Sequence, residues 1–386
     1  MNAWTARMLG LFMALVLCIS GAAAQETMEI FVSRGAATAQ QARQIVSLLE
    51  DEGEASWVLT MEQDESLKQR ILAGRAPDLA ICAPGQALPY AREGMLLALQ
   101  KRIDSQTRMQ RQVLGSCVHE ETLFMAPLAA RHRQMAVNTA LFEQVGLGYM
   151  LDREASPVWF PAQFYQIMEE FMMRGQTTLD IWRAEPVSSA AIEALTQAIF
   201  GGMLIDEDGE GFAADSADLC GGVRWLHDAV NAQMIGYCET REEALDRFMA
   251  EETAIFIDWT QQEAERQRQA LQESGMEIVL MPYPAAAGTA VRSFELTGIC
   301  AFASGDAARD VRLLAAVEHL DAQAEAVFGA RGIWQDHAAW LWDPGAHAYG
   351  ATLRSLYCRA LGQVLEEGRD VQAALGSVQA AMETMK

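Results

Sequence analysis

The stretch APLAARHRQMAVNTALFEQVGL, Ala126 to Leu147, places a strand pattern directly before a helix pattern. Its strand half carries Arg131, His132 and Arg133, where strands usually place Val, Ile or aromatic residues. Because side chains alternate along a strand, Arg131 and Arg133 share one face and His132 takes the other. The position predicts either that both arginines pair with surface acids or that one of them contacts a ligand.

Strand and helix patterns alternate on both sides of this stretch. Residues 77–84, PDLAICAP, are continuously apolar, which is typical of a buried parallel strand. Before them, residues 28–33 and 56–61 read as strands, and residues 38–55 read as a helix with Ala42, Ile45, Val46 and Leu49 on one face. The alternation predicts an α/β lobe with a mostly parallel sheet.

The alternation continues to the end of the chain. We expect an amphipathic helix over 188–203, capped by Ser188 or Ser189, and a tight hairpin followed by a helix from about Asp215. No repeat or long low-complexity linker interrupts the pattern, so any lobes are joined by short crossings. The other expected helices cover 161–175, 242–250, 307–320, 353–368 and 370–385, and the other strands cover 177–182, 253–259, 276–284 and 297–304.

Composition limits the partners. The chain has 386 residues, an apolar fraction of 51% and a formal net charge of −23. A surface that acidic repels phosphate backbones and anionic lipid headgroups, so we expect no nucleic acid and no polybasic membrane contact. The length is comfortable for two lobes, and we expect a monomer.

The first 24 residues have the pattern of a secretory signal peptide. Arg7 precedes the apolar run 8–20, and small residues lead to an expected cut after Ala24. The pattern predicts export to the periplasm or the cell surface. Cys18 raises the alternative of a lipid anchor, but Leu17 stands where lipid-attachment sites want a small residue.

The cysteines that follow the signal are widely and irregularly spaced. Several lie inside apolar runs such as LAICAP and LTGICAFA, so buried free thiols are favoured over disulfides. They are Cys82, Cys117, Cys220, Cys238, Cys300 and Cys358.

Five segments, in order, resemble the bacterial extracellular solute-binding proteins of ABC transporters, of the carbohydrate-binding type. They are LKQRILAGRAPDLAICAPGQALPYAREGMLLAL (67–99), MAPLAARHRQMAVNTALFEQVGL (125–147), GGMLIDEDGEGFAADSADLCGGVRWLHDAVNAQMI (201–235), RFMAEETAIFIDW (247–259) and VLMPYPAAAG (279–288). Asn138 matches the family's key asparagine.

The resemblance implies a two-lobed periplasmic-binding-protein-like fold of type II, with a ligand cleft between lobes that are joined by three crossings. The first lobe would comprise residues 26–128 and 285–321, and the second residues 132–281 and 325–386. Hinge closure on a small polar solute, in the first place a sugar, would present the liganded form to the permease subunits. No cofactor and no enzymatic activity are expected.

Candidate ligand-binding residues follow the ends of the expected strands, where open α/β sheets bind ligands. In the first lobe these are Ser33 and Arg34, then Cys82, Pro84 and Gly85. Relatives often carry an aromatic or an acid in this second loop, and its absence here argues against a standard oligosaccharide site. For Ser33 and Arg34 the alternative is an ordinary helix cap and surface loop.

The second lobe offers acids and tryptophans. Glu185, in a Glu-Pro pair that resembles the family's sugar-contacting loop, would accept hydroxyl groups, or is simply a solvated acid. Asp258 and Trp259 form the strongest pair, because a carboxylate accepts hydroxyls and an indole stacks on a sugar ring. The alternative for Trp259 is a buried residue that caps the sheet. Weaker candidates are Glu295, Trp340 and Trp342.

Arg131 tests the charge of the ligand. The resemblance places the first crossing at Pro127 to Arg131, and a sugar-binding relative can carry a carboxylate where this chain has Arg131. As a ligand clamp, Arg131 would indicate an acidic solute, such as a sugar acid or organic acid.

Enzyme motifs do not fit. HEETL at His119 has Leu123 where a zinc protease needs its second histidine, and neither a nucleophile elbow nor a phosphate loop is present in the sequence. A ligand-sensing subunit of a membrane receptor stays open as an alternative, and an exported hydrolase is the weakest one.

Overall fold

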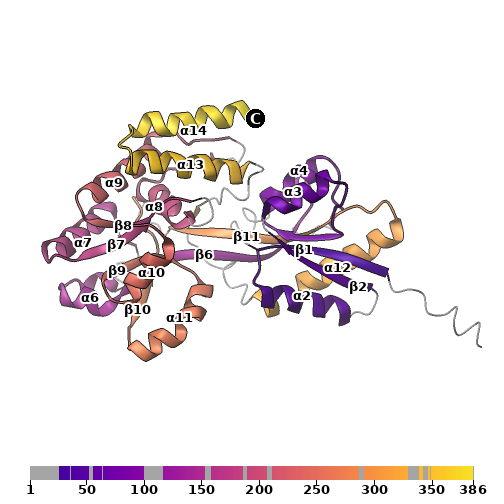
Figure 1. Cartoon of the computed structure of the whole chain (residues 1–386), viewed down its shortest axis with the longest axis horizontal. Helices are drawn as coiled ribbons and strands as arrows, with labels where there is room; N and C mark the ends of the chain where they lie inside the picture. Colours follow the sequence, from indigo (N-terminus) through magenta and orange to yellow (C-terminus); the bar gives the residue numbers. More distant parts are fainter. Residues whose placement is uncertain are drawn as a thin grey trace, which may run out of the picture.

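The computed structural model describes residues 26–34, 36–51, 55–62, 64–99, 116–152, 158–185, 189–206, 211–286, 291–328, 339–341, 347 and 349–385. The expected signal peptide, with Cys18, lies outside these residues, as does Trp342. Two α/β lobes lie along the longest axis and are joined by two long strands, β6 (Ala126–Asn138) and β11 (Val291–Ala301) (Figure 1). The predicted two-lobed α/β fold is confirmed.

The first lobe is built around three strands near the beginning of the chain. Strands β1, β2 and β3 and helix α2 follow the predicted order, and a two-strand hairpin, β4–β5, follows later. The elements are β1 (Glu26–Ser33), α2 (Ala39–Asp51), β2 (Ala55–Glu62), α3 (Asp64–Leu72), β3 (Leu79–Cys82), α4 (Pro84–Arg92), β4 (Val118–His119), β5 (Thr122–Leu123) and α12 (Ala307–Phe328).

The second lobe holds most of the helices. Its elements are α6 (Thr139–Gln144), the 3-10 helix η1 (Gly148–Leu151), α7 (Pro161–Met173), β7 (Thr177–Trp182), α8 (Ala190–Phe200), α9 (Ala217–Asn231), β8 (Ile235–Cys238), α10 (Arg241–Met249), β9 (Thr253–Trp259), α11 (Gln261–Ser274), β10 (Ile278–Met281), α13 (Gly350–Leu365) and α14 (Val371–Met385). The short strand β12 (Ala339–Leu341) pairs with the beginning of β11. Among the described helices, none is both long enough and apolar enough to span a bilayer.

One continuous sheet runs through both lobes, in the order β2-β1-β3-β11-β6-β9-β7-β8. The three strands at each end are parallel to one another, as the continuous apolar pattern of residues 77–84 predicts. The two crossing strands are antiparallel to each other and to their outer neighbours β3 and β9. Each lobe therefore has a parallel sheet, and the antiparallel part of the sheet marks the junction between the lobes.

Both faces of the first-lobe sheet are covered by helices. Ile30 and Val32 of β1 belong to the apolar cluster under α2 and α12, whereas Phe31 belongs to the cluster on the α4 side. This alternation follows from the period-two geometry of a strand, and it explains why the strand is apolar at successive positions. The second lobe has one large cluster, which includes side chains of β6, β7, β9, α8 and α13.

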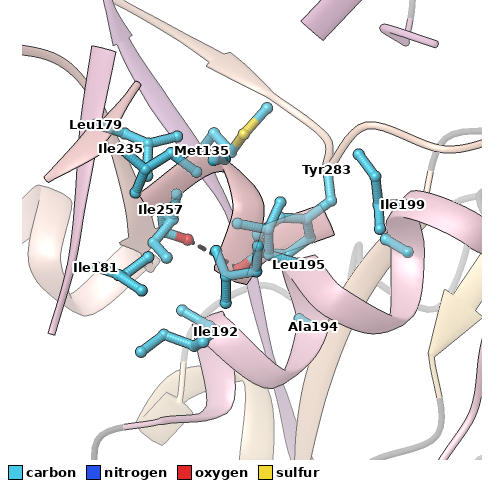
Figure 2. Close-up of a cluster of buried hydrophobic side chains, with 14 of the residues drawn as sticks. Met135, Leu179, Ile181, Ile192, Ala194, Leu195, Ile199, Ile235, Ile257 and Tyr283 are labelled. Atoms are coloured by element: carbon cyan, nitrogen blue, oxygen red, sulfur yellow. Dashed lines mark hydrogen bonds between the residues drawn. The ribbon is translucent and has the colours of Figure 1, made fainter. Parts of the chain in front are cut away.

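The prediction that α8 is amphipathic is wrong. Residues 190–199 are all buried, because α8 lies inside the second lobe, against the sheet and against α9. Figure 2 shows the α8 side chains Ile192, Leu195 and Ile199 in one apolar cluster with Ile181 and Ile257 of the sheet. Its polar side chains have buried partners: Glu193 accepts from Arg354 Nε at 3.0 Å, and Thr196 bonds Tyr357 Oη at 2.6 Å. Ser189 is the N-cap residue, but its hydroxyl donates to the carbonyl of Glu185 at 2.6 Å instead of capping the helix.

Helix α11 has no counterpart in the sequence prediction. Its sequence, QQEAERQRQALQES, has no long apolar stripe. The local signal for it is a cap: Thr260 Oγ1 accepts from the backbone N–H of Glu263 at 3.2 Å, and Gly275 ends the helix with φ of 71°. The helix forms because its ends are satisfied, because Ala264 and Leu271 pack against the second-lobe core, and because the buried Glu263 is paired with Arg241.

The last expected crossing, between residues 321 and 325, falls inside α12. That helix continues to Phe328, and Ala324 and Val327 pack in the first-lobe cluster with Leu313 and Val317. An uninterrupted amphipathic helix cannot change lobes in its middle without exposing these side chains.

The six cysteines from Cys82 onward are free and buried, which confirms that interpretation. Burial raises the pKa of the Cys358 thiol to about 11, so this group stays protonated at neutral pH.

Candidate functional site

The carboxyl ends of the parallel strands of both lobes point at the junction. Strand β6 runs from the first lobe into the second, β3 has the same direction as β6, and β9 has the opposite direction. Hence β1 and β3 end toward the second lobe, while β7 and β9 end toward the first. Open α/β sheets bind ligands beyond the carboxyl ends of their strands, so this junction is the candidate site.

In the first lobe, the structure separates the predicted residues by burial. Ser33 and Cys82, the last residues of β1 and β3, are buried, whereas Arg34 is exposed. The backbone N–H of Arg34 donates to the carbonyl of Glu62 at 2.9 Å, which fixes the turn after β1. Arg34 is therefore the residue directly after β1 that is exposed to solvent at the carboxyl end of this strand.

Helix α4 begins directly after β3. Pro84 and Gly85 are buried in its first turn, and Ala83 provides no side-chain cap for the helix. Gln86, next in line, has a buried side-chain oxygen with no hydrogen-bond partner within the described part of the chain. The first turn of α4 thus brings backbone N–H groups and one unpaired amide oxygen to the end of β3.

In the second lobe, Glu185 is exposed and its carbonyl accepts from the backbone N–H of Ser189 at 3.0 Å. Residues 186–188, which follow it, lie outside the described part. The structure therefore places Glu185 on the surface after β7, and it does not bring this side chain to Asp258 by any described contact.

Asp258 lies at the end of β9 and binds two arginines. Its Oδ1 accepts from Arg133 Nε at 2.7 Å, and its Oδ2 accepts from Arg241 Nε. Arg241, in the first turn of α10, also pairs with Glu263 of α11 at 2.8 Å. The carboxylate that the sequence offers as a hydroxyl acceptor is thus held firmly by two guanidinium groups, each from a different element.

Glu295 joins the same group from the other crossing strand. Its Oε1 lies 2.9 Å from Arg133 Nη2, and its side chain is 27% exposed, against 9% for Asp258 and 12% for Arg133. Burial would lower the pKa of Arg133, but Glu295 and Asp258 together outweigh burial and raise the pKa above its ordinary value. Arg133 is therefore always charged, and of these three side chains Glu295 is the one most open to solvent.

We call Arg133, Asp258, Arg241, Glu263 and Glu295 the junction network. It has two guanidinium groups against three carboxylates. The exposed Arg266 lies 3.9 Å from Glu263, so the network carries no surplus positive charge. Such a group offers acceptors to hydroxyls and has no spare cation for an anionic ligand.

Trp259 is buried in the second-lobe core, not open to a ligand in this conformation. Its ring packs against those of Phe248 and Phe256, with centroids 6.1 and 6.4 Å away. Its Nε1 is also buried, with no partner among the described groups. Of the two readings of Trp259 from the sequence, the buried tryptophan that caps the sheet fits this position.

Two predicted residues are described by their backbone alone. Arg131 pairs with Glu295 across β6 and β11, and Trp340 pairs with Arg292 across β12 and β11; their side chains lie outside the described part. The backbone places Arg131 beside Glu295 and on the same face of β6 as Arg133.

The sequence interpretation missed Arg133 as the centre of the site. Arg133 pairs with acids, as one of the two readings expected, but Asp258 is buried and Glu295 only partly exposed, so these are not ordinary surface pairs. The available signal was the shared face of Arg131 and Arg133. What could not be read was the register that brings Glu295 and Asp258 to either side of that face.

A small pocket elsewhere does not coincide with this junction. It has a volume of about 70 Å³ and lies in the first lobe between β1, β2, α2 and α12. Met28, near the amino end of β1, lines it together with Trp57, Arg312 and His319. Within the described residues, no group of three or more His, Cys, Asp or Glu side chains is arranged to hold a metal ion.

Comparison of the sequence with protein-family models and with curated proteins finds no match. Solved structures do match, over more than nine tenths of the chain. The GacH receptor of Streptomyces glaucescens, solved without ligand and with acarbose, has a TM-score of 0.70 at 14% identity, over 93% of this chain and 98% of that one.

Two further structures agree. Lmo0181 from Listeria monocytogenes, an ABC substrate-binding protein in complex with cycloalternan, has a TM-score of 0.69 at 11% identity, over 94% of this chain and 99% of that one. The sugar-binding protein MalE from Xanthomonas citri has a TM-score of 0.70 at 13% identity, over 92% and 96%. The chain therefore has the two-lobed fold of the ABC-transporter solute-binding proteins.

Proposed function

We propose that this protein is the substrate-binding component of an ABC importer and that it captures a carbohydrate between its lobes. Closure of the lobes around the sugar would present the complex to the membrane permease. The observation that carries the proposal is the structural match to sugar-binding proteins. Each alignment includes almost all residues of this chain and almost all residues of the matched protein. Binding without turnover is the proposed activity.

The junction network supports an uncharged sugar over a sugar acid. A polyol needs acceptors for its hydroxyl hydrogens, and Glu295, 27% exposed, is the most exposed carboxylate of the junction network. An acidic ligand would need a surplus cation, and among the described side chains of the network each guanidinium already faces two carboxylates. The ion pairs that hold these acceptors are largely buried, which preserves their geometry.

We further propose which residues meet the ligand. Arg34 and the first turn of α4, at Pro84 and Gly85, would contribute from the first lobe, and Asp258 and Glu295 from the opposite side. Ser33, Cys82 and Trp259 would support these contacts from the buried ends of their strands. Further candidates are Arg131, Glu185, Trp340 and Trp342.

The lobe boundaries are proposed accordingly. The first lobe would contain residues 26–128 and the segment from 285 to Phe328, since α12 packs there along its whole length. The second would contain residues 132–281 and the chain from about 339 onward. We propose that the protein is exported and acts as a monomer.

A thermal-shift screen tests the function. The probes are acarbose, cycloalternan, D-tagatose and maltose as uncharged sugars, and glucuronate and galacturonate as acids. A ligand at a hundred times its Kd stabilises the folded protein by about 2.7 kcal/mol. We expect one or more uncharged sugars to raise Tm by several degrees and the acids to leave it unchanged.

Isothermal titration and product analysis then separate the alternatives. A hit should titrate with one site and be recovered chemically unchanged after long incubation. Recovery of hydrolysed sugar would overturn the proposal in favour of an enzyme. A shift with the acids alone would replace the sugar with an anionic solute, and no shift with any probe would count against the carbohydrate class.

A further inference from the structure

Arg133 occupies the residue of β6 at which the strand changes partner. His132 is the last residue of β6 in register with β11, where it faces Phe294. Gln134 is the first residue in register with β9, where it faces Trp259. Arg133 lies between these two registers, so its backbone is in the ladder of neither neighbour.

The side chain of Arg133 connects strands β9 and β11, although its backbone pairs with neither of them. On one side it pairs with Glu295, which follows Phe294 on β11, and on the other with Asp258, which precedes Trp259 on β9. The register between β6 and β9 also shifts between Gln134 and Ala136. Ion pairs therefore hold the three strands together at the point where backbone pairing is interrupted.

The two sides of this connection differ in firmness. Asp258 is also bound by Arg241, which is bound by Glu263, so α10 and α11 fix the carboxylate within the second lobe. Glu295 is the more exposed partner and belongs to the strand that enters the first lobe. A rotation of one lobe against the other must be absorbed by a few residues at such a junction, and it changes the Arg133–Glu295 contact first.

Arg133 has one donor that no described group accepts. Nη1 is buried and has no partner among the described groups. Because a buried donor without an acceptor is costly, a lobe orientation that gives this donor an acceptor would be favoured over one that does not. Contacts that differ between two orientations are what a residue needs in order to bias an equilibrium between them.

We propose that Arg133 is a positioning residue of the hinge: its pairs with Glu295 and Asp258 set the orientation of the two lobes in the absence of ligand. It acts through these carboxylates and does not itself contact the sugar. The inference rests on the two-lobed fold and goes beyond the proposed ligand. According to this inference, the relative orientation of the two lobes without ligand depends on the side chain of Arg133.

The test measures the distance between the lobes without any ligand. Spin labels are attached at Ser47→Cys on α2 and Gln166→Cys on α7, two exposed positions in different lobes. The native thiols from Cys82 onward are buried, so in the chain that follows the expected signal peptide the labels react at the introduced cysteines. Pulsed electron paramagnetic resonance then gives the distribution of label distances for each variant.

Arg133→Gln and Glu295→Gln should each shift and broaden this distribution, and the double variant should change it no more than either single one. Arg133→Lys keeps the charge but not the planar guanidinium group. Its distribution of label distances should lie between those of the Gln variants and that of the wild type. Arg247→Gln is the matched control, because Arg247 pairs with the buried Asp180 away from the junction. It should lower Tm and leave the distribution unchanged.

An unchanged distribution in Arg133→Gln would overturn the inference, as would an equal change in Arg247→Gln. Neither result depends on sugar binding, so failure here is distinguishable from failure of the proposed function. If a sugar is found, its Kd should change in Arg133→Gln and not in Arg247→Gln. Arg133→Lys should restore part of the affinity.

Discussion

Asp180, in the middle of β7, places its Oδ1 2.9 Å from Nη1 of Arg247 on α10. The carboxylate lies over Gly236 of β8, the residue in register with it. Burial raises the pKa of Asp180 to about 6, because the loss of water outweighs the attraction of Arg247 and because Glu243 adds repulsion. A buried acid with an arginine partner is therefore still costly to ionise.

This pKa predicts a pH dependence of stability. The folded state binds the proton of Asp180 more tightly than the unfolded state, whose pKa has the ordinary value of 3.8. The contribution to stability is fully present below about pH 4 and is lost as the pH rises through about 6. Urea unfolding at several pH values should show this loss in the wild type and a flatter profile in Asp180→Asn. Parallel profiles for the two proteins would contradict it.

Gly236→Ala should destabilise the second lobe. A Cβ added at Gly236 would lie 1.8 Å from Asp180 Oδ1, an overlap that the short side chain of Asp180 cannot relieve without losing Arg247. Overpacking of this kind typically costs about 1–3 kcal/mol. Urea unfolding gives the value, and Gly362→Ala is the control, since a Cβ there meets nothing within 4 Å. Equal effects of the two substitutions would refute the steric argument.

Asp258→Ala should act on stability before it acts on affinity. Its removal leaves Arg133 and Arg241 without the carboxylate they share, and breaking a buried ion pair costs about 3–5 kcal/mol. Glu185→Ala, at an exposed acid after β7, should change stability by less than about 0.5 kcal/mol. The free energies of unfolding are compared in urea. A stable Asp258→Ala protein would show that the junction network does not hold the second lobe together.

The thiols should be protected from alkylation in the folded protein. All six cysteines from Cys82 onward are buried, and burial raises the pKa of the Cys117 and Cys358 thiols. Iodoacetamide reacts with thiolates, so modification at pH 8 should be slow in buffer and complete in denaturant without reductant. Mass spectrometry counts the adducts. Labelling that stays incomplete in denaturant until reductant is added would indicate a disulfide instead.

The sequence determined most of the architecture because its signals are local. Apolar runs such as residues 77–84 need burial on both faces, and this alone indicates parallel strands between helices. The alternation of such runs with helical patterns predicted the order of most elements and an α/β lobe, and the family resemblance added the second lobe. The strand ends, and hence Asp258 and Glu295 as candidate groups, followed from the same periodicity.

Only the tertiary structure decided what each polar group does. Glu193, Thr196 and Gln197 look like the solvent face of an amphipathic helix, yet α8 is buried on all sides and they find partners in the interior. Helix α11 escaped detection because it is held by its caps, by the ion pair between Glu263 and Arg241, and by two apolar contacts too few to form a stripe.

The junction network shows the same limit. Arg133 and Glu295 are 162 positions apart in the chain, and their meeting depends on the register between β6 and β11. A register shifted by one residue would turn every side chain of the strand to the other face. Periodicity specifies which residues are buried within an element, whereas the partner of a buried charge is fixed only when the elements are placed against one another.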